Sequence, residues 1–343
     1  MTSREQNTAV GDFDLARWIQ PVPGHAIFRE PGYHVWCGTM IRSRDGRCHL
    51  YYSRWRSGEG FLAWVTHSEI AHAVADNPLG PYHPVDVALP ARGPKFWDGH
   101  CTHNPTILES GGRWYLYYMG NRGDRQPSEG LNFSHRNNQR IGVAVADSPG
   151  GPWQRFDAPL IDATPGFHDA LCCANPAVIR RAGGGFLMVY KAVANQRPLP
   201  FGGPVTHVVA TSASPEGPFA KMPAPVFTKP GADFPAEDPC LWHQDGAYMA
   251  VVKDMNGFFT NEGRSLALMQ SRDGMDWNPA KNTLVSKTEY TADDGRRIPL
   301  HVLERPQLWL DRGEPAVLFC AASADPQPNG GETFNIAIPL RRP

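Results

Sequence analysis

The sequence predicts an all-β protein folded as a five-bladed β-propeller, and three observations carry this prediction. A hairpin unit, made of an apolar strand, a Gly-rich turn and an aromatic strand, recurs five times along the 343 residues. The copies are regularly spaced, at intervals of 66, 71, 63 and 67 residues. A third strand and a Pro/Gly turn follow the hairpin in the first four periods. Four antiparallel strands repeated about five times are typical of a propeller, which closes radially and leaves only short strand edges.

The hairpin copies can be aligned on the residue before a proline. Proline lacks an N–H and suits the first residue of a strand, β-branched residues suit its interior, and paired glycines suit a hairpin turn. The anchors are Gly38, Asn104, Asn175, Asp238 and Arg305. The copies are CGTMIRSRDGRCHLYY (37–52, the weakest), HNPTILESGGRWYLYY (103–118), ANPAVIRRAGGGFLMVY (174–190), EDPCLWHQDGAYMAVV (237–252) and ERPQLWLDRGEPAVLF (304–319).

The Pro/Gly turn is the second repeated element. It reads ADNPLGPY at 75–82, ADSPGGPW at 146–153 and SASPEGPF at 212–219, with a degenerate copy at 271–277. The fifth unit ends early, with Phe334 to Leu340 as its third strand, so we expect the N-terminal segment 13–28 to close the ring. The predicted single domain, 1–343, has blades at about 30–90, 97–160, 168–225, 233–285 and 298–343. Two packed sandwiches are the alternative, but they give no reason for five copies.

Composition limits the classes of partner. Lys plus Arg (33) nearly equal Asp plus Glu (34), so no general attraction to nucleic acid or an anionic membrane is expected. No apolar run approaches the roughly 20 residues of a membrane helix, and we expect a cytoplasmic, soluble protein. The seven cysteines are odd in number and lack CxxC spacing, which favours buried reduced thiols over disulfides or structural zinc.

The repeated pattern resembles that of glycoside hydrolase family 43 and the related five-bladed families 32, 68, 117 and 130. The shared features are an Asp or Asn before the proline, the Gly-rich hairpin, and the ADSPxGP turn that ends in an aromatic residue. In those families the first strand of each blade starts at the central axis. Three acidic residues from different blades act there as base or nucleophile, tuning carboxylate and general acid. The resemblance therefore implies an active site in a funnel on the axis and an oligosaccharide substrate.

Two glutamates match the acid motif of these families. Glu237-Asp238-Pro239 has Glu237 in the place of the proton donor, and Glu304-Arg305-Pro306 repeats the pattern one blade later. We expect crowding and partial burial to raise the pKa of Glu237, so that it acts as the acid. The family's acidic positions in blades one and three are occupied by Gly38-Thr39 and Asn175.

Asp98 and Asp169 are candidates to replace the missing carboxylates. Each lies six residues before the asparagine of its blade, in a segment expected to hang over the funnel. We predict Asp98 as the base, with Asp169 second, and expect Asp98 and His103 to face Glu237. The Trp-Asp context resembles family 117, whose members use an Asp base and a His acid, so His103 or His301 is the alternative donor.

The remaining site prediction concerns substrate binding. A pyranose face is apolar, so tryptophans near the axis are candidate stacking platforms. Arg305 suits a sugar carboxylate or sulfate, or equally a salt bridge to a pocket acid. The predicted substrate-binding residues are His34, Trp36, Trp97, His103, Asn104, His168, Asn175, Asp238, His301 and Arg305. No cofactor or metal ligand is assigned, because no motif such as HExxH is present, although a central metal ion is an alternative.

The sequence thus predicts a glycoside hydrolase that acts from the end of a small oligosaccharide. By resemblance we expect it to invert the anomeric centre. One alternative is a phosphorylase similar to family 130, which requires a cationic phosphate subsite. Another is a non-catalytic sugar-binding propeller, which the changed acidic positions favour. A nucleotide-binding role has no support, since the glycine run 183–185 is a hairpin turn that precedes no helix. The sugar, the linkage and the oligomeric state stay open.

Overall fold

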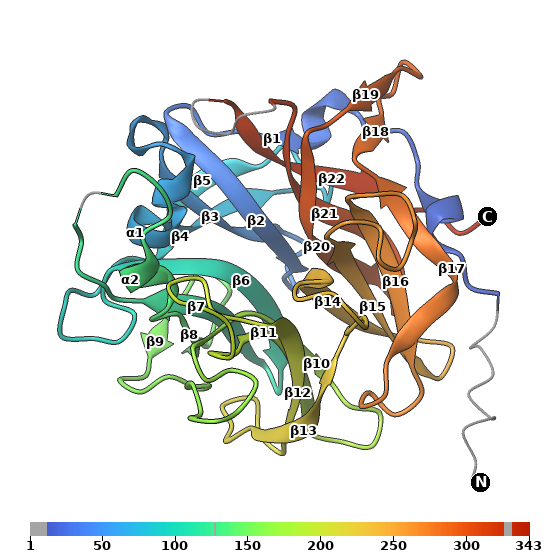
Figure 1. The fold of residues 1–343 in the computed structure, drawn as a ribbon. Coiled ribbons are helices and arrows are strands. Elements are labelled where there is room, and N and C mark those ends of the chain that lie inside the picture. The colour runs from blue at the N-terminus through green and yellow to red at the C-terminus, as the bar shows by residue number, and fades with distance from the viewer. Residues whose placement is uncertain (1–11, 127, 326–330) are drawn as a thin grey trace, which may run out of the picture.

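Five four-stranded antiparallel sheets are arranged in a ring, which confirms the predicted five-bladed β-propeller (Figure 1). The computed structural model describes residues 12–126, 128–325 and 331–343. In Figure 1 the blades follow one another round the ring from blue through green and yellow to red. The first and last blades therefore lie side by side, with β2 (Tyr33–Arg42) in contact with β20 (Val302–Asp311).

Blades one to four are meanders in which consecutive strands pair, as the hairpin and turn patterns predict, and the last blade adds one strand from the N-terminal segment. Blade one consists of β2, β3 (Cys48–Arg56), β4 (Glu69–Ala75) and β5 (His83–Leu89). Blade two consists of β6 (Cys101–Ser110), β7 (Arg113–Asn121), β8 (Arg140–Ala146) and β9 (Gln154–Arg155). Blade three consists of β10 (Cys172–Arg180), β11 (Phe186–Val193), β12 (Val205–Ser212) and β13 (Ala220–Val226). Blade four consists of β14 (Ala236–Gln244), β15 (Ala247–Asp254), β16 (Ser265–Ser271) and β17 (Asn278–Lys287). Blade five consists of β20, β21 (Glu314–Ser323), β22 (Thr333–Pro339) and β1 (Ile27–Phe28).

The N-terminal segment supplies the outer strand of the last blade. Only Ile27–Phe28 of the expected segment 13–28 forms a strand, and it pairs antiparallel with β22. Short 3₁₀ helices occupy Leu15–Trp18 and Gly24–Ala26. Leu15 is fully buried in the core shared by blades four, five and one, so this segment is tied down by packing as well as by pairing.

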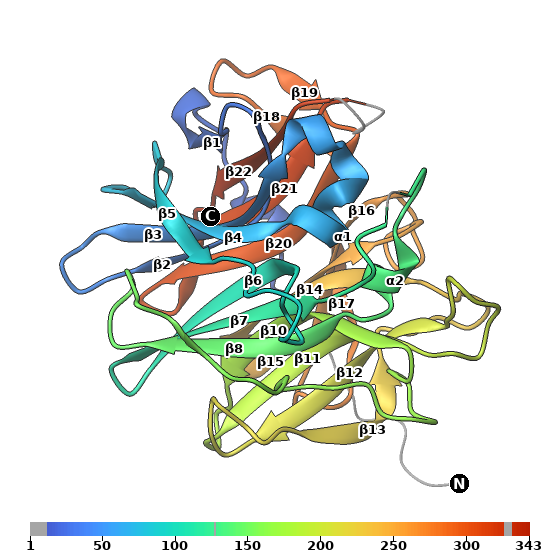
Figure 2. The same cartoon turned by 90° about the vertical axis from the view of Figure 1, so that its left-hand side faces the viewer.

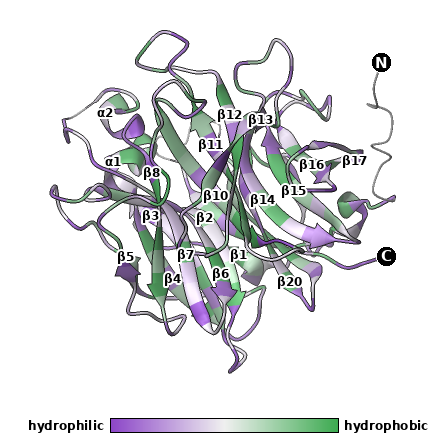
Figure 3. Cartoon of the chain, turned by 90° about the horizontal axis from the view of Figure 1, so that it is seen from below, coloured by the Kyte–Doolittle hydropathy of each residue, from purple (hydrophilic) through white to green (hydrophobic). Residues whose placement is uncertain are grey.

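Helices and additional strands are few and lie between or outside the blades. Two short helices, α1 (Trp64–His67) and α2 (Phe133–Arg136), follow β3 and β7, and 3₁₀ turns occupy Ser57–Glu59 and Phe61–Ala63. The hairpin β18 (Glu289–Thr291) and β19 (Arg297–Pro299) stands away from the ring, at the top of Figure 2. Apolar residues are concentrated in the strands, where blades pack on each other, whereas the loops are mostly hydrophilic (Figure 3). The described helices include none that is both long and apolar enough to cross a bilayer.

A β-bulge interrupts the first strand of every blade at the axis. Pairing breaks between Trp36 and Thr39 in blade one and at equivalent points in the others, such as His103 and Thr106. The residue at the centre of each break has a φ between 52° and 58°, in the left-handed region. These five residues are Cys37, Asn104, Asn175, Asp238 and Arg305.

The register corrects the sequence alignment of blade one. Cys37, and not Gly38, is the counterpart of Asn104, and Gly38 occupies the place that proline has in the other blades. A side chain at Gly38 would collide with Asn335, since a Cβ there would lie 2.9 Å from its Nδ2 atom. The Gly38 N–H instead donates to Asn335 Oδ1 at 3.2 Å. The position held by Asn104, Asn175, Asp238 and Arg305 in the other blades is therefore occupied by a thiol in blade one.

Candidate functional site

The five bulge residues form a belt of hydrogen-bonded side chains around the axis. The Cys37 thiol donates to Asn104 Oδ1 at 3.0 Å, and Asn104 Nδ2 donates to Asn175 Oδ1. Asn175 Nδ2 and Arg305 Nη1 both donate to Asp238 Oδ1, at 2.5 and 3.0 Å. The belt links all five blades, and it fixes the residue before each bulge position at the axial end of its strand.

A cavity of about 130 Å³ lies on one side of this belt. Four aromatic side chains form part of its wall, and two of them, Phe61 and Trp64, come from the segment between β3 and β4. Charged and amide side chains face them. The lining residues are Trp36, Trp55, Phe61, Trp64, His103, Asn104, Asn175, Lys191, Glu237, Asp238, Glu304 and Arg305. The structure therefore gathers the predicted residues Trp36, His103, Asn104, Asn175, Glu237, Asp238, Glu304 and Arg305 in one site.

Two lysines hold Glu237 in its ionised form. Lys191 Nζ donates to Glu237 Oε1 at 2.7 Å, and Lys253 Nζ lies 3.5 Å from Oε2 while it also contacts Glu304. Burial raises the pKa of Glu237, but the charges of Lys191 and Lys253 outweigh burial and keep that pKa well below its usual range. The expectation of a raised pKa at Glu237 is therefore wrong. The two lysines, which the sequence analysis did not consider, are the reason.

Asp238 is the carboxyl group whose pKa is raised. Burial and the negative charge of Glu237 raise its pKa to about 6, against the opposing charge of Arg305. Its Oδ1 atom accepts both belt hydrogen bonds, and no donor in the described part of the chain reaches Oδ2. Oδ2 is therefore the oxygen that can carry a proton. In the same way, Glu304 binds Lys253 through Oε2 and leaves Oε1 without a described partner.

His103 lies in the cavity wall as a neutral side chain. Its Nδ1 atom is 2.7 Å from the Ser68 hydroxyl and its Nε2 atom is 3.6 Å from the Cys37 sulfur. Burial, together with the charges of Arg305 and Lys191, lowers its pKa well below the usual value. A histidine that stays neutral is poorly suited to give a proton to a leaving group.

Asp98 and Asp169 both lie away from the cavity, although Asp98 was expected to face Glu237 and Asp169 was the second candidate base. Asp98 is fully buried and accepts hydrogen bonds from Arg92 at 2.6 Å, Tyr118 at 2.7 Å and Arg155 at 3.2 Å. Asp169 is likewise buried. It is held by Lys221 at 2.6 Å, Tyr190 at 2.8 Å and the Thr164 N–H at 3.1 Å. Each carboxylate ties a loop to its own blade, and neither lines the cavity.

The other predicted binding residues lie around the site rather than in it. His34 is buried behind the aromatic wall, with its ring 5.2 Å from that of Trp55. Trp97 stacks on Tyr118 with the ring centres 5.6 Å apart. His168 contacts the Pro223 carbonyl oxygen at 3.0 Å, and His301 is exposed beside Lys253 and Glu304 at a separate small crevice. None of these four lines the axial cavity.

The repeated hairpin could have predicted the positions of Lys191 and Lys253. Lys191 pairs across the hairpin with Ala174, and Lys253 pairs with Glu237, each directly opposite the residue before the bulge. The site therefore receives side chains from the second strands of blades one, three and four, namely Trp55, Lys191 and Lys253, as well as from the first strands. By contrast, Phe61 and Trp64 belong to an insertion in blade one for which the other blades offer no template.

The described residues around the site do not form a set of metal ligands. Among the described residues, no group of three or more His, Cys, Asp or Glu side chains is arranged to hold a metal ion. The charges in the cavity instead compensate one another. Three cationic side chains, Lys191, Lys253 and Arg305, meet three carboxyl groups, Glu237, Asp238 and Glu304.

The chain shares its architecture with several solved glycoside hydrolases. It is similar to Zg3597, a family 117 glycoside hydrolase of the marine bacterium Zobellia galactanivorans, with 18% identity, a TM-score of 0.63, and coverage of 94% of this chain and 89% of that one. It is also similar to an endo-arabinase from Bacteroides thetaiotaomicron, with 13% identity, a TM-score of 0.57, and coverage of 95% of this chain and 98% of that one. A third similar structure is an α-L-arabinofuranosidase from Lactobacillus brevis, with 13% identity, a TM-score of 0.61, and coverage of 95% of this chain and 94% of that one. No protein-family model and no curated protein sequence matches the chain.

Proposed function

We propose that the protein is a glycoside hydrolase whose chemistry takes place in the axial cavity. The observation that carries the proposal is that three carboxyl groups, Glu237, Asp238 and Glu304, line one cavity, and that the pKa values of Glu237 and Asp238 are shifted in opposite directions. Glycoside hydrolysis requires one protonated and one ionised group at the same pH. Similarity of fold to glycoside hydrolases over nearly the whole chain supports the same reaction class.

The three carboxyl groups can be given distinct roles. Asp238 is the general acid, because its pKa is raised and Oδ2 is available to carry the proton. Glu304 is the base that activates water, because Oε1 is not engaged by any described donor. Glu237 is the tuning carboxylate, since its charge raises the pKa of Asp238 while the lysines keep it ionised. This assignment moves the acid from Glu237 to the adjacent residue.

The cavity favours a neutral sugar unit at the end of an oligosaccharide. Its volume of about 130 Å³ leaves room for little more than one monosaccharide ring, and the aromatic wall suits the apolar face of that ring. Every cationic group in the cavity already contacts a carboxylate, so a phosphate or uronate subsite has little support. A hydrolase is therefore favoured over a phosphorylase.

Turnover of a panel of aryl glycosides, together with arabino- and xylo-oligosaccharides, tests this proposal. On the oligosaccharides, Glu304→Gln and Asp238→Asn should each lower kcat by about 10²- to 10⁴-fold, whereas Glu262→Gln, which removes an exposed carboxylate, should not. Unchanged turnover in both cavity variants would contradict the assignment. Turnover that requires phosphate would identify a phosphorylase, and binding without turnover a sugar-binding propeller.

The stereochemical outcome is a separate test. We propose inversion, with Glu304 and Asp238 acting from opposite sides of the sugar ring. Proton NMR of the first product formed distinguishes the two anomers. Retention would instead point to Glu237 and Glu304 as the reacting pair, since a single ammonium group joins them and closely spaced carboxylates are typical of retaining enzymes.

A further inference from the structure

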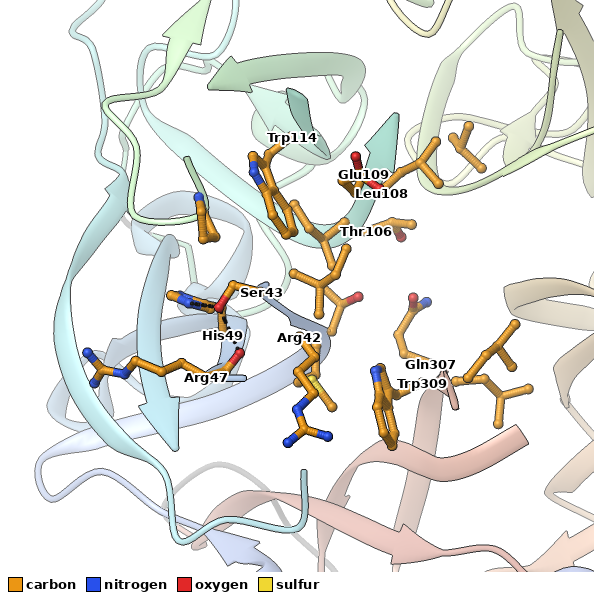
Figure 4. Close-up of a pocket in the computed structure, with 18 of the residues that line it drawn as sticks. Arg42, Ser43, Arg47, His49, Thr106, Leu108, Glu109, Trp114, Gln307 and Trp309 are labelled. Atoms are coloured by element: carbon orange, nitrogen blue, oxygen red, sulfur yellow. Dashed lines mark hydrogen bonds between the residues drawn. The ribbon is translucent and has the colours of Figure 1, made fainter. Parts of the chain in front are cut away.

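A second and larger cavity, of about 920 Å³, lies on the other side of the side-chain belt. Figure 4 shows residues that line it. The first strand of each blade passes from the axial cavity through the belt and continues along the wall of this second cavity. The belt therefore divides the central channel into two compartments. None of the residues that line the second cavity also lines the first.

Equivalent positions of the five blades form the inner end of this second cavity. Two residues beyond each belt residue stand Thr39, Thr106, Ala177, Cys240 and Gln307. Further along the strands, the wall is apolar and includes Leu108 and Trp309, with Trp114 contributed by β7. In Figure 4 the side chains of Trp114, Thr106, Gln307 and Trp309 lie around a common space.

Gln307 has an amide group without a partner. Its side chain is only 6% exposed, and its Nε2 atom makes no hydrogen bond within the described part of the chain. A buried amide that lacks a partner is unfavourable, and it is usually explained by a bound water or ligand. The indole N–H of Trp309 also has no described acceptor. Two donors therefore border the same cavity as an aromatic ring.

The charges at the rim argue against an anionic ligand. Three arginines are balanced by four carboxylates, so no excess of positive charge would attract a phosphate or a nucleic acid. The rim residues are Arg42, Arg44, Arg47, Asp45, Glu109, Asp147 and Asp311.

We propose that this second cavity binds a neutral oligosaccharide without cleaving it. Indole faces stack on the apolar face of a sugar ring, and free amide and indole N–H groups donate to its hydroxyl oxygens. The cavity is about seven times larger than the axial cavity and can hold several sugar units. The proposal does not depend on the hydrolase assignment, because it uses none of the same side chains.

Calorimetric titration of the full chain with arabinotriose and xylotriose tests the second site. Glu304→Gln is used as the starting protein so that hydrolysis is slow during the titration. Two binding events are expected for at least one sugar. Adding Trp309→Ala should weaken one of them more than about tenfold, and adding Gln307→Leu should weaken it roughly five- to tenfold. Trp277→Ala, which removes a tryptophan outside both cavities, should leave both events unchanged.

Folding and turnover measurements separate the possible failures. Gln307→Leu should unfold at the same or a higher denaturant concentration than the parent, because it removes an unpaired buried amide. In the otherwise unaltered chain, Trp309→Ala should hydrolyse short aryl glycosides at the parental rate. A single binding event that neither variant weakens would overturn the second site. Binding that depends on Trp309 in a protein that hydrolyses none of the sugars would overturn the hydrolase and leave this inference standing.

Discussion

Asp238 has a pKa of about 6, although Arg305 contacts it, because burial and the charge of Glu237 act in the opposite direction. If Asp238 is the acid, it must be protonated for catalysis, so kcat/KM should be highest below about pH 6 and fall about tenfold per pH unit above it. A kcat/KM profile from about pH 4 to about pH 9 measures this. Asp238→Asn should abolish this decline and spare substrates with good leaving groups, such as dinitrophenyl glycosides. An unchanged profile in the variant would show that another group titrates.

Lys253 is the residue on which the charge arrangement depends most. It contacts both Glu237 and Glu304, and all three side chains are largely buried. Lys253→Met should lower the free energy of unfolding by about 3–5 kcal/mol, because it leaves buried carboxylates with fewer partners. Lys287→Met, which breaks an exposed pair with Glu262, should cost about 0–1 kcal/mol. Denaturant unfolding of both variants measures the difference, and equal losses would contradict the role given to Lys253.

Residue chemistry at the axis could be predicted only in part from the sequence. Glu237, Asp238 and Glu304 were identified because they stand at repeated strand starts, and the structure gathers them. The position of Asp98 was predicted wrongly. Its place near a strand start does not reveal that Arg92 and Arg155 lie beside it and form ion pairs with it. The pKa of Glu237 is lowered and not raised, because Lys191 and Lys253 come to it from the second strands of blades three and four.

At the scale of elements, the bulge in the first strand of each blade, with its residue in the left-handed region, places the side chains of the site. At Asn104, φ is 55°, where alanine is strained by about 1–2 kcal/mol and glycine is not. Asn104→Gly and Asn104→Ala lose the same hydrogen bonds, so the glycine variant should be the more stable by about 1 kcal/mol. In the regular strand β15, Ala250→Gly should instead lower the free energy of unfolding by at least about 0.5 kcal/mol. Denaturant unfolding of the three variants checks this reversal, and an alanine variant as stable as the glycine one would contradict it.

The elements themselves were largely predictable, and the reasons are local. Alternating apolar residues around Gly turns determine the hairpins, and their repetition predicts the propeller. The insertion that carries Phe61 and Trp64 could not be predicted, because it occurs in one blade and its place over the axis depends on packing against Trp36 and Trp55. The N-terminal segment was expected to be a longer strand, but Leu15 is anchored in the core by a 3₁₀ turn.

At the scale of the whole molecule, closure of the ring depends on the N-terminal segment, which joins the last blade through two strand residues and packs Leu15 into the core of blades four, five and one. Leu15→Ala should therefore lower the free energy of unfolding by about 2–5 kcal/mol, as deletion of a fully buried leucine does. Leu199→Ala removes the same atoms from a side chain that is 65% exposed and should stay within about 0.5 kcal/mol of the parent. Urea unfolding followed by both circular dichroism and tryptophan fluorescence measures the two changes. Coincident transitions at a lower urea concentration for Leu15→Ala are expected, because the segment closes one cooperative ring. A variant as stable as Leu199→Ala would mean that the ring closes without this anchor.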